Sequence, residues 1–522
     1  MDVPETFNLA SCLVDRHVAE GRGHRVAIHT ATRDLTYRDV LELTNRTGNA
    51  LLGLGVRPEE RVLLLLHDVP ELVCSFFGAM KIGAVAVPVS TLLVAADYEH
   101  MLRDSRAAVA VVGEALWPRL AGIARERLPR LRHVVVVGDA PEGALSFDAL
   151  TRAASPDLQA EPTSRDDAAF WLYSSGTTGA PKGVIHAHQD AVHTAEHYAR
   201  GVLGIHEGDR CFSVAKLFFA YGLGNGLTFP FYVGASTVLH AGPPAARSVY
   251  DVVARHRPTL FFSVPTGYGM LLAETGEADL SSVRLAVSAG EALPGALYER
   301  FRARFGLEIL DGIGSTEVLH IFISNRPGRV RPGSSGEVVP GYEARIEADD
   351  GELVRPGEVG HLLIRGESTC AAYWNQRQKT RATLRGDWIR TGDQYRQDED
   401  GYFWHAGRSD DMLKVGGIWV SPVEIEATLA AHPAVHEAGV VGRDDGDGLV
   451  KPAAWVVLRA GHAASEALAA DVQAFVRERL AAYKRPRWVE FVASLPRTAT
   501  GKLQRFKLRE SRAPTAGTGT SS

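Results

Sequence analysis

A loop of small polar residues is the first candidate for chemistry. Residues 174–182 read SSGTTGAPK and combine glycines, hydroxyls and one ammonium, that of Lys182. Glycines allow a sharp turn with inward-pointing N–H groups, and hydroxyls and an ammonium add donors for an anion. The spacing departs from the G-x-x-x-x-G-K-[ST] pattern. We therefore predict a phosphate-holding loop of another kind, fed by the apolar strand FWLYSS and followed by a helix-like segment; a surface turn is the alternative.

A second stretch, DGIGSTEVLHIF at 311–322, joins a strand to a glycine-rich turn that ends in Ser315, Thr316 and Glu317. Ligands bind α/β sheets where the carboxyl end of a strand meets a loop. Glu317 has two readings, a partner of a helix N-cap or a hard oxygen ligand for Mg²⁺ near phosphates.

Further along the chain, two charged groups have weaker local signals. Asp393, in IRTGD, is either a turn residue or an acceptor for the two hydroxyls of a ribose. Lys502 stands in a glycine-bearing loop near the end of the chain, where a lysine is usually solvated. His186 and His188 form an H-A-H pair without a nearby carboxylate or cysteine, so a metal site there is disfavoured.

The elements that must position these groups alternate between short apolar runs and amphipathic segments. Strands are expected at 61–69, 84–89, 107–113, 132–139, 259–265, 283–290 and 307–314, and a helix at 70–83. This alternation predicts α/β architecture with largely parallel sheets. From about residue 330 short strands broken by glycine and proline predict a small β unit, 407–417 resembles a linker, and about a hundred residues of mixed α+β pattern follow.

Composition limits the classes of function. The chain has 522 residues, a net charge of −5 and no long basic run, which disfavours nucleic acid as a partner. Its four cysteines lack paired spacing, which indicates a reducing compartment. The N-terminus has no apolar core, and no apolar run approaches the roughly 18–20 residues of a membrane helix. We expect a cytoplasmic protein that is not inserted in a membrane.

Taken together, the motifs resemble those of the adenylate-forming superfamily, which includes acyl- and aryl-CoA ligases, adenylation domains of peptide synthetases, and luciferases. YSSGTTGAPKG, SAGEALP, DGIGSTE, TGD, GRSDD and PRTATGK occur in this order over about residues 8–511. LFFAYGLGNGLTFP (217–230) and DGIGSTEVLHIF are most similar to benzoate–CoA ligases. Thr177 stands where many of those ligases have serine, and it keeps the hydroxyl.

The resemblance implies a fold and a domain order. The expected fold is a large N-terminal domain of two βα-sheets plus a small distorted β-barrel, followed by a mobile α+β lid. The expected bounds are 1–408 for the N-terminal AMP-binding domain (β-rich at about 330–408), 409–411 for a hinge at Asp410, and 412–511 for the lid. Residues 512–522 are expected to be a disordered tail.

The resemblance also implies roles in a reaction of ATP with a carboxylic acid. Glu317 would bind Mg²⁺, Thr316 would contact the α-phosphate, and Lys502 would bridge the substrate carboxylate and the α-phosphate. Gly416 and Gly417 would line a tunnel for pantetheine after rotation about the hinge. The predicted nucleotide-binding residues are Ser174, Ser175, Gly176, Thr177, Thr178, Lys182, Gly290, Glu291, Asp311, Gly312, Ile313, Asp393 and Arg408.

An aromatic acid is the favoured substrate. Residues 212–232 contain no carboxylate that could pair the ammonium of an amino acid, and an unpaired buried ammonium would be costly. The positions that match ring contacts in benzoate ligases are Ala220, Tyr221, Phe229, Gly314, His320 and Ile321. For His320, a wall of this slot and a core histidine donating to backbone are weighed equally.

The leading hypothesis is an ATP-dependent ligase that joins benzoate, or a small substituted benzoate, to CoA. Transfer to the phosphopantetheine arm of an acyl carrier protein, a short- or medium-chain fatty acyl ligase, and a non-catalytic nucleotide-binding regulator are the alternatives. Either a monomer or a homodimer is compatible with the sequence.

Overall fold

The computed structural model describes residues 2–174, 181–276, 278–408, 411–415, 418–445, 450–480, 484–497 and 503–510. Its contacts group the chain into two compact units. The first unit contains residues 1–293, 297–345 and 363–391, and the second contains 294–296, 346–362 and 392–522. Each unit is described by itself below.

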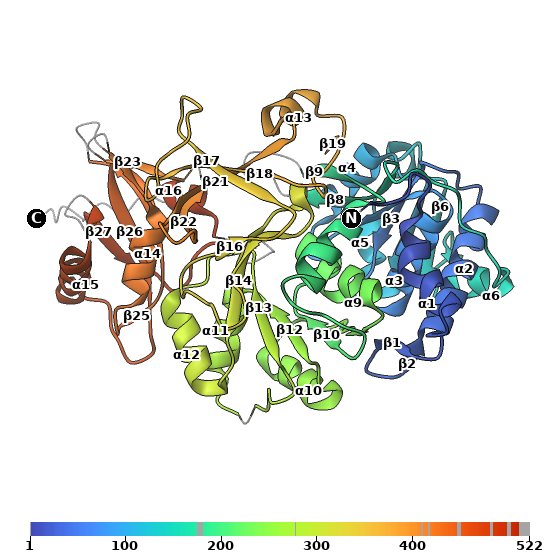
Figure 1. Cartoon of the computed structure of the whole chain (residues 1–522), viewed down its shortest axis with the longest axis horizontal. Coiled ribbons are helices and arrows are strands. Elements are labelled where there is room, and N and C mark those ends of the chain that lie inside the picture. Colours follow the sequence, from blue (N-terminus) through green and yellow to red (C-terminus); the bar gives the residue numbers. More distant parts are fainter. Residues whose placement is uncertain are drawn as a thin grey trace, which may run out of the picture. The chain divides into compact units, whose positions relative to one another are not determined.

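An eight-stranded sheet of the first unit has the order β19-β9-β8-β4-β3-β5-β6-β7 (Figure 1). The six strands from β8 to β7 in this order pair in parallel, and β9 and β19 add antiparallel edges. Continuous apolar runs form the buried strands, as expected where helices cover a parallel sheet. The bounds are β3 (Arg61–Leu65), β4 (Val85–Pro88), β5 (Val109–Gly113), β6 (His133–Val137), β7 (Leu145–Ser146), β8 (Ala168–Ser174), β9 (Lys182–Ala187) and β19 (Ala372–Tyr373).

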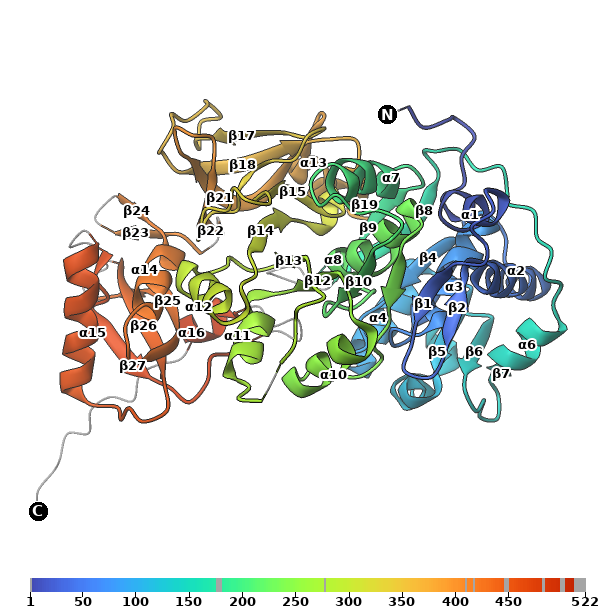
Figure 2. The same cartoon turned by 60° about the horizontal axis from the view of Figure 1, so that its bottom comes forward.

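A nine-stranded sheet of the same unit has the order β16-β15-β14-β13-β12-β10-β11-β1-β2 (Figure 2). Its strands from β14 to β1 are parallel, and β15, β16 and β2 are antiparallel. The bounds are β1 (Val26–His29), β2 (Asp34–Thr36), β10 (Arg210–Ser213), β11 (Ser236–Val238), β12 (Leu260–Ser263), β13 (Leu285–Ser288), β14 (Ile309–Gly314), β15 (Ile321–Ser324) and β16 (Glu337–Val338).

Helices pack on these sheets. Helix α10, for example, buries Val249, Tyr250 and Val253 in the core that β12 and β13 share. The α-helices in the first part of the chain are α1 (Arg16–Ala19), α2 (Tyr37–Gly53), α3 (Pro70–Lys81), α4 (Ala95–Ser105), α5 (Pro118–Ala121), α6 (Phe147–Ala153), α7 (Asp190–Thr194), α8 (Ala220–Leu223), α9 (Phe229–Val233), α10 (Ala246–His256), α11 (Pro265–Ala273), α12 (Gly295–Phe305) and α13 (Arg377–Thr383).

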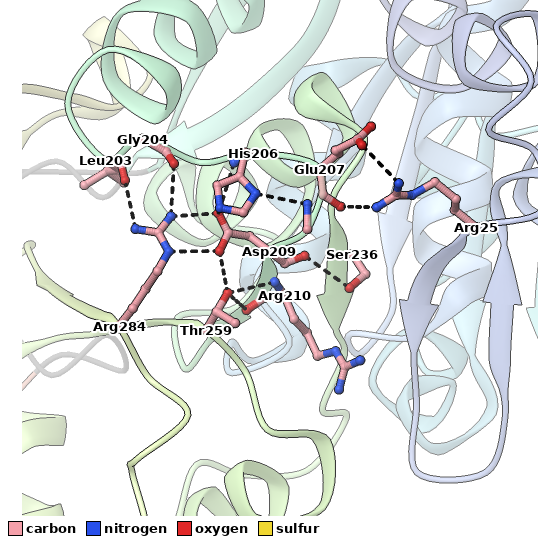
Figure 3. A network of polar contacts seen from close by, with 11 residues as sticks. Arg25, Leu203, Gly204, His206, Glu207, Asp209, Arg210, Ser236, Thr259 and Arg284 are labelled. Carbon is pink, nitrogen blue, oxygen red and sulfur yellow. Dashed lines mark hydrogen bonds and ion pairs between the residues drawn. The ribbon is translucent and has the colours of Figure 1, made fainter.

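A network of polar contacts joins the residues that directly precede β10, β12 and β13 (Figure 3). Arg284 donates from Nε and Nη2 to the two carboxylate oxygens of Asp209, at 2.9 and 2.7 Å. Thr259 Oγ1 donates to Asp209 Oδ1 at 2.7 Å, and the backbone N–H of His206 donates to Oδ2 at 3.0 Å. Burial alone would raise the pKa of Asp209, but these donors lower it on balance. The network aligns three strands at the end opposite to their carboxyl ends, where α/β sheets generally bind ligands.

Shorter β elements and a second α+β region complete the chain. A five-stranded sheet has the order β17-β18-β21-β20, with β22 paired to β21. Another sheet has the order β25-β26-β27, and β23 pairs with β24. The bounds are β17 (Glu343–Glu347), β18 (Gly360–Arg365), β20 (Leu384–Arg385), β21 (Trp388–Gln397), β22 (Phe403–Arg408), β23 (Leu413–Val415), β24 (Ile418–Val420), α14 (Pro422–Ala430), β25 (Val435–Asp444), β26 (Val450–Leu458), α15 (Glu466–Arg479), β27 (Trp488–Phe491) and α16 (Arg505–Glu510).

The predicted α/β class with largely parallel sheets is confirmed. One local prediction is wrong: the segment after the phosphate loop is the strand β9, not a helix. Val184 and Ile185 are β-branched, and both edges of β9 are paired, to β8 and to β19. In the described part of the chain no helix has the length and apolar character needed to cross a membrane.

Candidate active site

The DGIGSTEVLHIF stretch folds as a hairpin in the first unit. Gly312, Ile313 and Gly314 of β14 pair with Ser324, Ile323 and Ile321 of β15. Residues 315–320 are therefore the turn, and they carry Thr316, Glu317 and His320 together. A Cβ on Gly314 would lie 2.5 Å from the carbonyl oxygen of His320, so this close crossing requires glycine.

The N-cap reading of Glu317 is wrong. The short 3₁₀ turn Thr316–Val318 is capped by Ser315, whose hydroxyl accepts from the N–H of Val318. The Glu317 carboxylate instead accepts a hydrogen bond from the Tyr373 hydroxyl, 2.8 Å from Oε1. Tyr373 lies 56 residues away in the sequence, and no local pattern indicated this contact.

The two ends of the phosphate loop face one another across a hairpin. Ser174, the last residue of β8, pairs with Lys182, the first residue of β9. Lys182 Nζ lies 4.5 Å from the ring centroid of Tyr373, the same residue that donates to Glu317. The structure thus brings Lys182 and Glu317 to two sides of one tyrosine.

The carboxylate of Glu317 is a suitable ligand for a hard cation. One of its oxygens accepts from Tyr373, and within the described residues the other has no hydrogen-bond partner. A half-buried carboxylate near the predicted phosphate loop is the donor type that Mg²⁺ takes, since this ion is held by one or two carboxylates plus phosphate oxygens and water.

The predicted adenine-contacting residues follow β13 and lie in β14. Gly290 has a φ of +90°, which suits glycine, and Glu291 accepts from the Thr266 hydroxyl at 2.9 Å. Asp311 Oδ2 accepts from the N–H of Leu293 at 3.4 Å. Burial raises the pKa of Asp311 to about 8, so its carboxyl group is largely protonated at neutral pH.

An aromatic cluster surrounds His320. The centroid of its ring lies 4.4 Å from that of Phe229, in an edge-on arrangement, and 5.6 Å from that of Tyr221. Nε2–H donates to the carbonyl oxygen of Tyr221 at 3.2 Å, which confirms the backbone-donor reading. Burial lowers the pKa of His320 to about 3, so the ring is neutral. Tyr198, which the sequence did not single out, is fully buried with its ring centroid 5.5 Å from that of His320.

A residue that follows the carboxyl end of β3 holds the segment leading into the helix that carries Ala220 and Tyr221. Asp68 accepts from the N–H of Leu217 at 3.1 Å, and Lys216 Nζ donates to the carbonyl oxygens of His240 and Gly242. Burial raises the pKa of Asp68 to about 6, against the opposing effect of Lys216. This buried group fixes the backbone that begins α8.

In the second unit, Asp393 and Arg408 are direct partners. They are opposite residues of the β21–β22 pair, and Arg408 Nη1 donates to Asp393 Oδ1 at 2.9 Å. The turn reading of Asp393 is wrong, because the residue lies within a ten-residue strand. Its preceding residue, Gly392, has a φ of +79°, and a Cβ there would lie 2.8 Å from Arg408 Nη2.

Several predicted residues lie outside the described part of the chain. These are Ser175, Gly176, Thr177, Thr178, Asp410, Gly416, Gly417 and Lys502, together with the tail at 512–522. The roles assigned to them stay predictions.

Both histidines of the H-A-H pair are buried and hydrogen-bonded to protein groups. His188 Nδ1 accepts from the N–H of Leu9 at 3.0 Å, and burial lowers its pKa to about 4. His186 contacts Asp190 and the carbonyl oxygen of Thr316. In the residues that the structure describes, no group of three or more His, Cys, Asp or Glu side chains is arranged to hold a metal ion.

Two family models match the chain. That of the AMP-binding enzymes matches residues 15–374, and that of the AMP-binding enzyme C-terminal domain matches residues 424–502. The matched ranges include every site residue named above in the first unit.

Curated relatives and solved structures agree with these models. Benzoate–CoA ligase of Thauera aromatica is 51% identical over 512 residues, 97% of this chain and 96% of the relative. The 4-hydroxybenzoate–CoA/benzoate–CoA ligase of Rhodopseudomonas palustris is 44% identical over 97% of this chain and 94% of the relative. The structure of the anthranilate CoA ligase AuaEII in complex with anthranoyl-AMP has a TM-score of 0.94 at 50% identity, covering 98% of both chains. That of a benzoate CoA ligase from Burkholderia xenovorans LB400 has a TM-score of 0.89 at 47% identity, covering 96% of this chain and 100% of the other.

Proposed function

Because this chain belongs to the AMP-binding enzyme family, we propose that it activates benzoate, or a small substituted benzoate, with ATP and transfers the acyl group to CoA. In the first step a carboxylate oxygen attacks the α-phosphorus, and pyrophosphate leaves with the electron pair of the broken P–O bond. In the second step the CoA sulfur attacks the acyl carbon, the thiol loses its proton to solvent, and AMP leaves with the electron pair of the broken acyl C–O bond.

The single observation that carries the proposal is the hairpin turn 315–320. This turn presents a neutral ring, His320, to an aromatic cluster, and it presents Thr316 and Glu317 three to four positions earlier. An acid whose ring packs beside His320 would therefore direct its carboxylate toward groups suited to phosphates. Such preorganisation of two reactants accounts for much of the rate gain of an enzyme.

The aromatic cluster around His320 suits a benzoate ring better than an alkyl chain or an amino acid. The rings of Tyr221, Phe229 and Tyr198 surround His320, and the pocket stretch 212–232 has no carboxylate for an ammonium. Offset or edge-on aromatic pairs add about 0.5–1.5 kcal/mol beyond area burial. The neutral state of His320 avoids burying a charge beside the ring.

The charged groups have these proposed roles. Lys182 and Ser174 hold the outer phosphates at the ends of their loop, Thr316 contacts the α-phosphate, and Asp393 with Arg408 holds the ribose. Mg²⁺, bound by Glu317, would supply positive charge against the phosphate oxygens. Lys502 offsets the repulsion between the carboxylate and the α-phosphate as they meet; removing one such contact typically costs about 10²–10³ in rate.

A substrate panel tests the proposal. We expect kcat/KM for benzoate to exceed that for hexanoate by at least about tenfold when pyrophosphate release is followed with free CoA. The same assay with a holo acyl carrier protein in place of CoA should give slower turnover. Preference for hexanoate would contradict the aromatic assignment, faster turnover with the carrier protein would contradict the acceptor, and no pyrophosphate release with any acid would favour a regulator.

A further inference from the structure

His186 links the strand that leaves the phosphate loop to the turn that carries Thr316. Its side chain is fully buried, and Nε2–H donates to the carbonyl oxygen of Thr316 at 2.8 Å, across 130 residues of sequence. Phe170 of the neighbouring strand β8 stacks on the imidazole with 5.4 Å between centroids and an interplanar angle of 25°. The ring therefore has one orientation, with its Nε2 edge toward the turn.

Asp190 fixes the other edge of the same ring. Its Oδ2 lies 2.8 Å from His186 Nδ1 and also accepts from the N–H of Ala187 at 3.1 Å. A carbonyl oxygen only accepts, so Nε2 carries a proton; the Nδ1···Oδ2 contact then holds a second proton on one of its two atoms. Burial raises the pKa of Asp190, and His186 lowers it. In this arrangement His186 is a permanent donor to Thr316.

The turn that receives this bond is held at three consecutive carbonyl groups. His186 donates to Thr316 O, the N–H of Cys370 donates to Glu317 O at 2.7 Å, and Ser368 Oγ donates to Val318 O at 2.9 Å. The next residue, Leu319, has a φ of +69°, which a leucine rarely adopts. Strained backbone of this kind persists only where its surroundings over-determine it, and it concentrates at functional sites.

We propose that His186 is a positioning residue for adenylation, which through the carbonyl group of Thr316 fixes the turn that presents Thr316 and Glu317 to the nucleotide. The inference rests on the roles proposed above for Thr316 and Glu317. Because β9 begins at Lys182, the same strand also ties the lysine of the phosphate loop to this turn. The chemical group it serves is the Mg²⁺-bound triphosphate.

Two substitutions separate the hydrogen bond from the volume of the ring. The amide of glutamine reaches about as far as Nε2, so His186→Gln can still donate to Thr316; the amide of asparagine reaches only about as far as Nδ1, so His186→Asn cannot. His24→Asn, at an exposed histidine whose Nδ1 contacts Gly21 O, is the matched control.

The decisive readout is the Kd of ATP by calorimetry, with Mg²⁺ and with EDTA. We expect His186→Asn to weaken binding of ATP with Mg²⁺ about tenfold, as the loss of one hydrogen bond of about 1.5 kcal/mol would do, with a smaller effect in EDTA. Benzoate-dependent pyrophosphate exchange should fall at least as much, while thioester formation from supplied benzoyl-AMP should stay within about threefold of wild type. His186→Gln and His24→Asn should both bind ATP with Mg²⁺ within about threefold of wild type.

Three outcomes would overturn the proposal. The first is wild-type binding and exchange in His186→Asn. The second is equal loss in His186→Gln and His186→Asn, because the ring rather than the bond would then matter. The third is parallel loss of both half-reactions and of thermal stability. If His186→Asn does not fold, weakened Mg²⁺-dependent binding in His186→Gln overturns it instead.

A further variant separates this inference from the proposed function. Glu317→Gln with wild-type binding of ATP and Mg²⁺ would refute the role of Glu317, whatever the His186 variants do. Absence of benzoate-dependent exchange in the wild type would refute the substrate, and the calorimetric comparison would still test the positioning.

Discussion

The hydroxyl of Tyr373 donates to the carboxylate of Glu317 at 2.8 Å, while the face of its ring lies 4.5 Å from the ammonium of Lys182. One side chain thus contacts an anion that is predicted to bind Mg²⁺ and a cation that is predicted to hold the outer phosphates of ATP. Its place in β19, which pairs with the strand that begins at Lys182, gives this arrangement a rigid base.

Removal of that hydroxyl should raise the requirement for Mg²⁺. Tyr373→Phe keeps the ring beside Lys182 and deletes the donor to Glu317, so the carboxylate loses its orientation. A hydrogen bond to a charged group contributes about 1.5–3 kcal/mol, and we expect the Mg²⁺ concentration for half-maximal pyrophosphate exchange to rise about tenfold. Tyr250→Phe also deletes a buried donor, to Leu271 O, in a core away from the site, and it should leave the Mg²⁺ requirement unchanged. An equal shift in both variants would contradict the role.

The aromatic slot should be sensitive to one methyl group at Gly224. A Cβ there would lie 2.3 Å from Cδ2 and 2.6 Å from Nε2 of His320, which is buried and cannot yield without moving the ring. Gly224→Ala should raise the KM for benzoate about tenfold and leave the Kd of ATP unchanged. Gly269→Ala is the matched control, because a Cβ at that position meets nothing within 4 Å. An unchanged KM in Gly224→Ala would argue that the ring of the acid does not bind beside His320.

The Arg284–Asp209 network should govern stability and not catalysis. Asparagine at 209 can accept through only one oxygen, so Asp209→Asn leaves at least one of the buried donors unpaired. Since Arg284 is partly exposed, we expect a loss of about 2–3 kcal/mol in the free energy of unfolding by urea, below the value for a fully buried pair. Asp279→Asn, in an exposed pair with Arg257, should change the midpoint little. A loss of kcat/KM in Asp209→Asn at temperatures where the protein is folded would contradict this division.

Buried neutral histidines should make the protein less stable in acid. The folded-state pKa of His188 is about 4, below its ordinary value of about 6.5, so the unfolded chain binds more protons as the pH falls through this window. Stability is therefore present above about pH 6.5 and is lost at about 1.4 kcal/mol per pH unit toward pH 4. The raised pKa of Asp311 acts in the opposite direction, so the test is a difference between two proteins.

The comparison uses His188→Asn, whose side-chain oxygen can accept from Leu9 as Nδ1 does. Urea unfolding at pH 5, 6 and 7 should show a shallower loss of stability in the variant than in the wild type. The difference in slope should approach about 1.4 kcal/mol per pH unit between pH 6 and 5 and be about half of that between pH 7 and 6. Identical slopes for the two proteins would show that His188 is not held neutral in the folded state.

Local sequence patterns predicted most of the strands and helices of the scaffold. The prediction failed where an element depends on pairing with residues far away in the sequence. The valine-rich run of β6 and the apolar run of β3 are strands as expected, because β-branched and apolar residues suit a sheet covered on both faces. The strand β9 was missed because its identity depends on β19, almost two hundred residues later. The secondary structure of a short segment with mixed propensity depends on such distant pairing partners, and the sequence of the segment itself does not reveal them.

The same distinction between local patterns and long-range contacts applies to the residues of the candidate site. Thr316, Glu317 and His320 lie in one motif, and the hairpin that unites them follows from that motif. Tyr373 and Tyr198 reach the site from segments 56 and 122 residues away from Glu317 and His320, and an isolated tyrosine carries no pattern that predicts such a contact. The contact of His186 with Thr316 was missed for the same reason, since the two residues are 130 residues apart.

The most direct test of the central claim is a crystal structure with a non-hydrolysable benzoyl-adenylate analogue. We expect the benzoyl ring to contact His320 within about 4.5 Å and the group that replaces the α-phosphate to lie within hydrogen-bonding distance of Thr316. One turn would then hold both reactants. A ring bound elsewhere, with His320 still enclosed by Tyr198, Tyr221 and Phe229 alone, would contradict it.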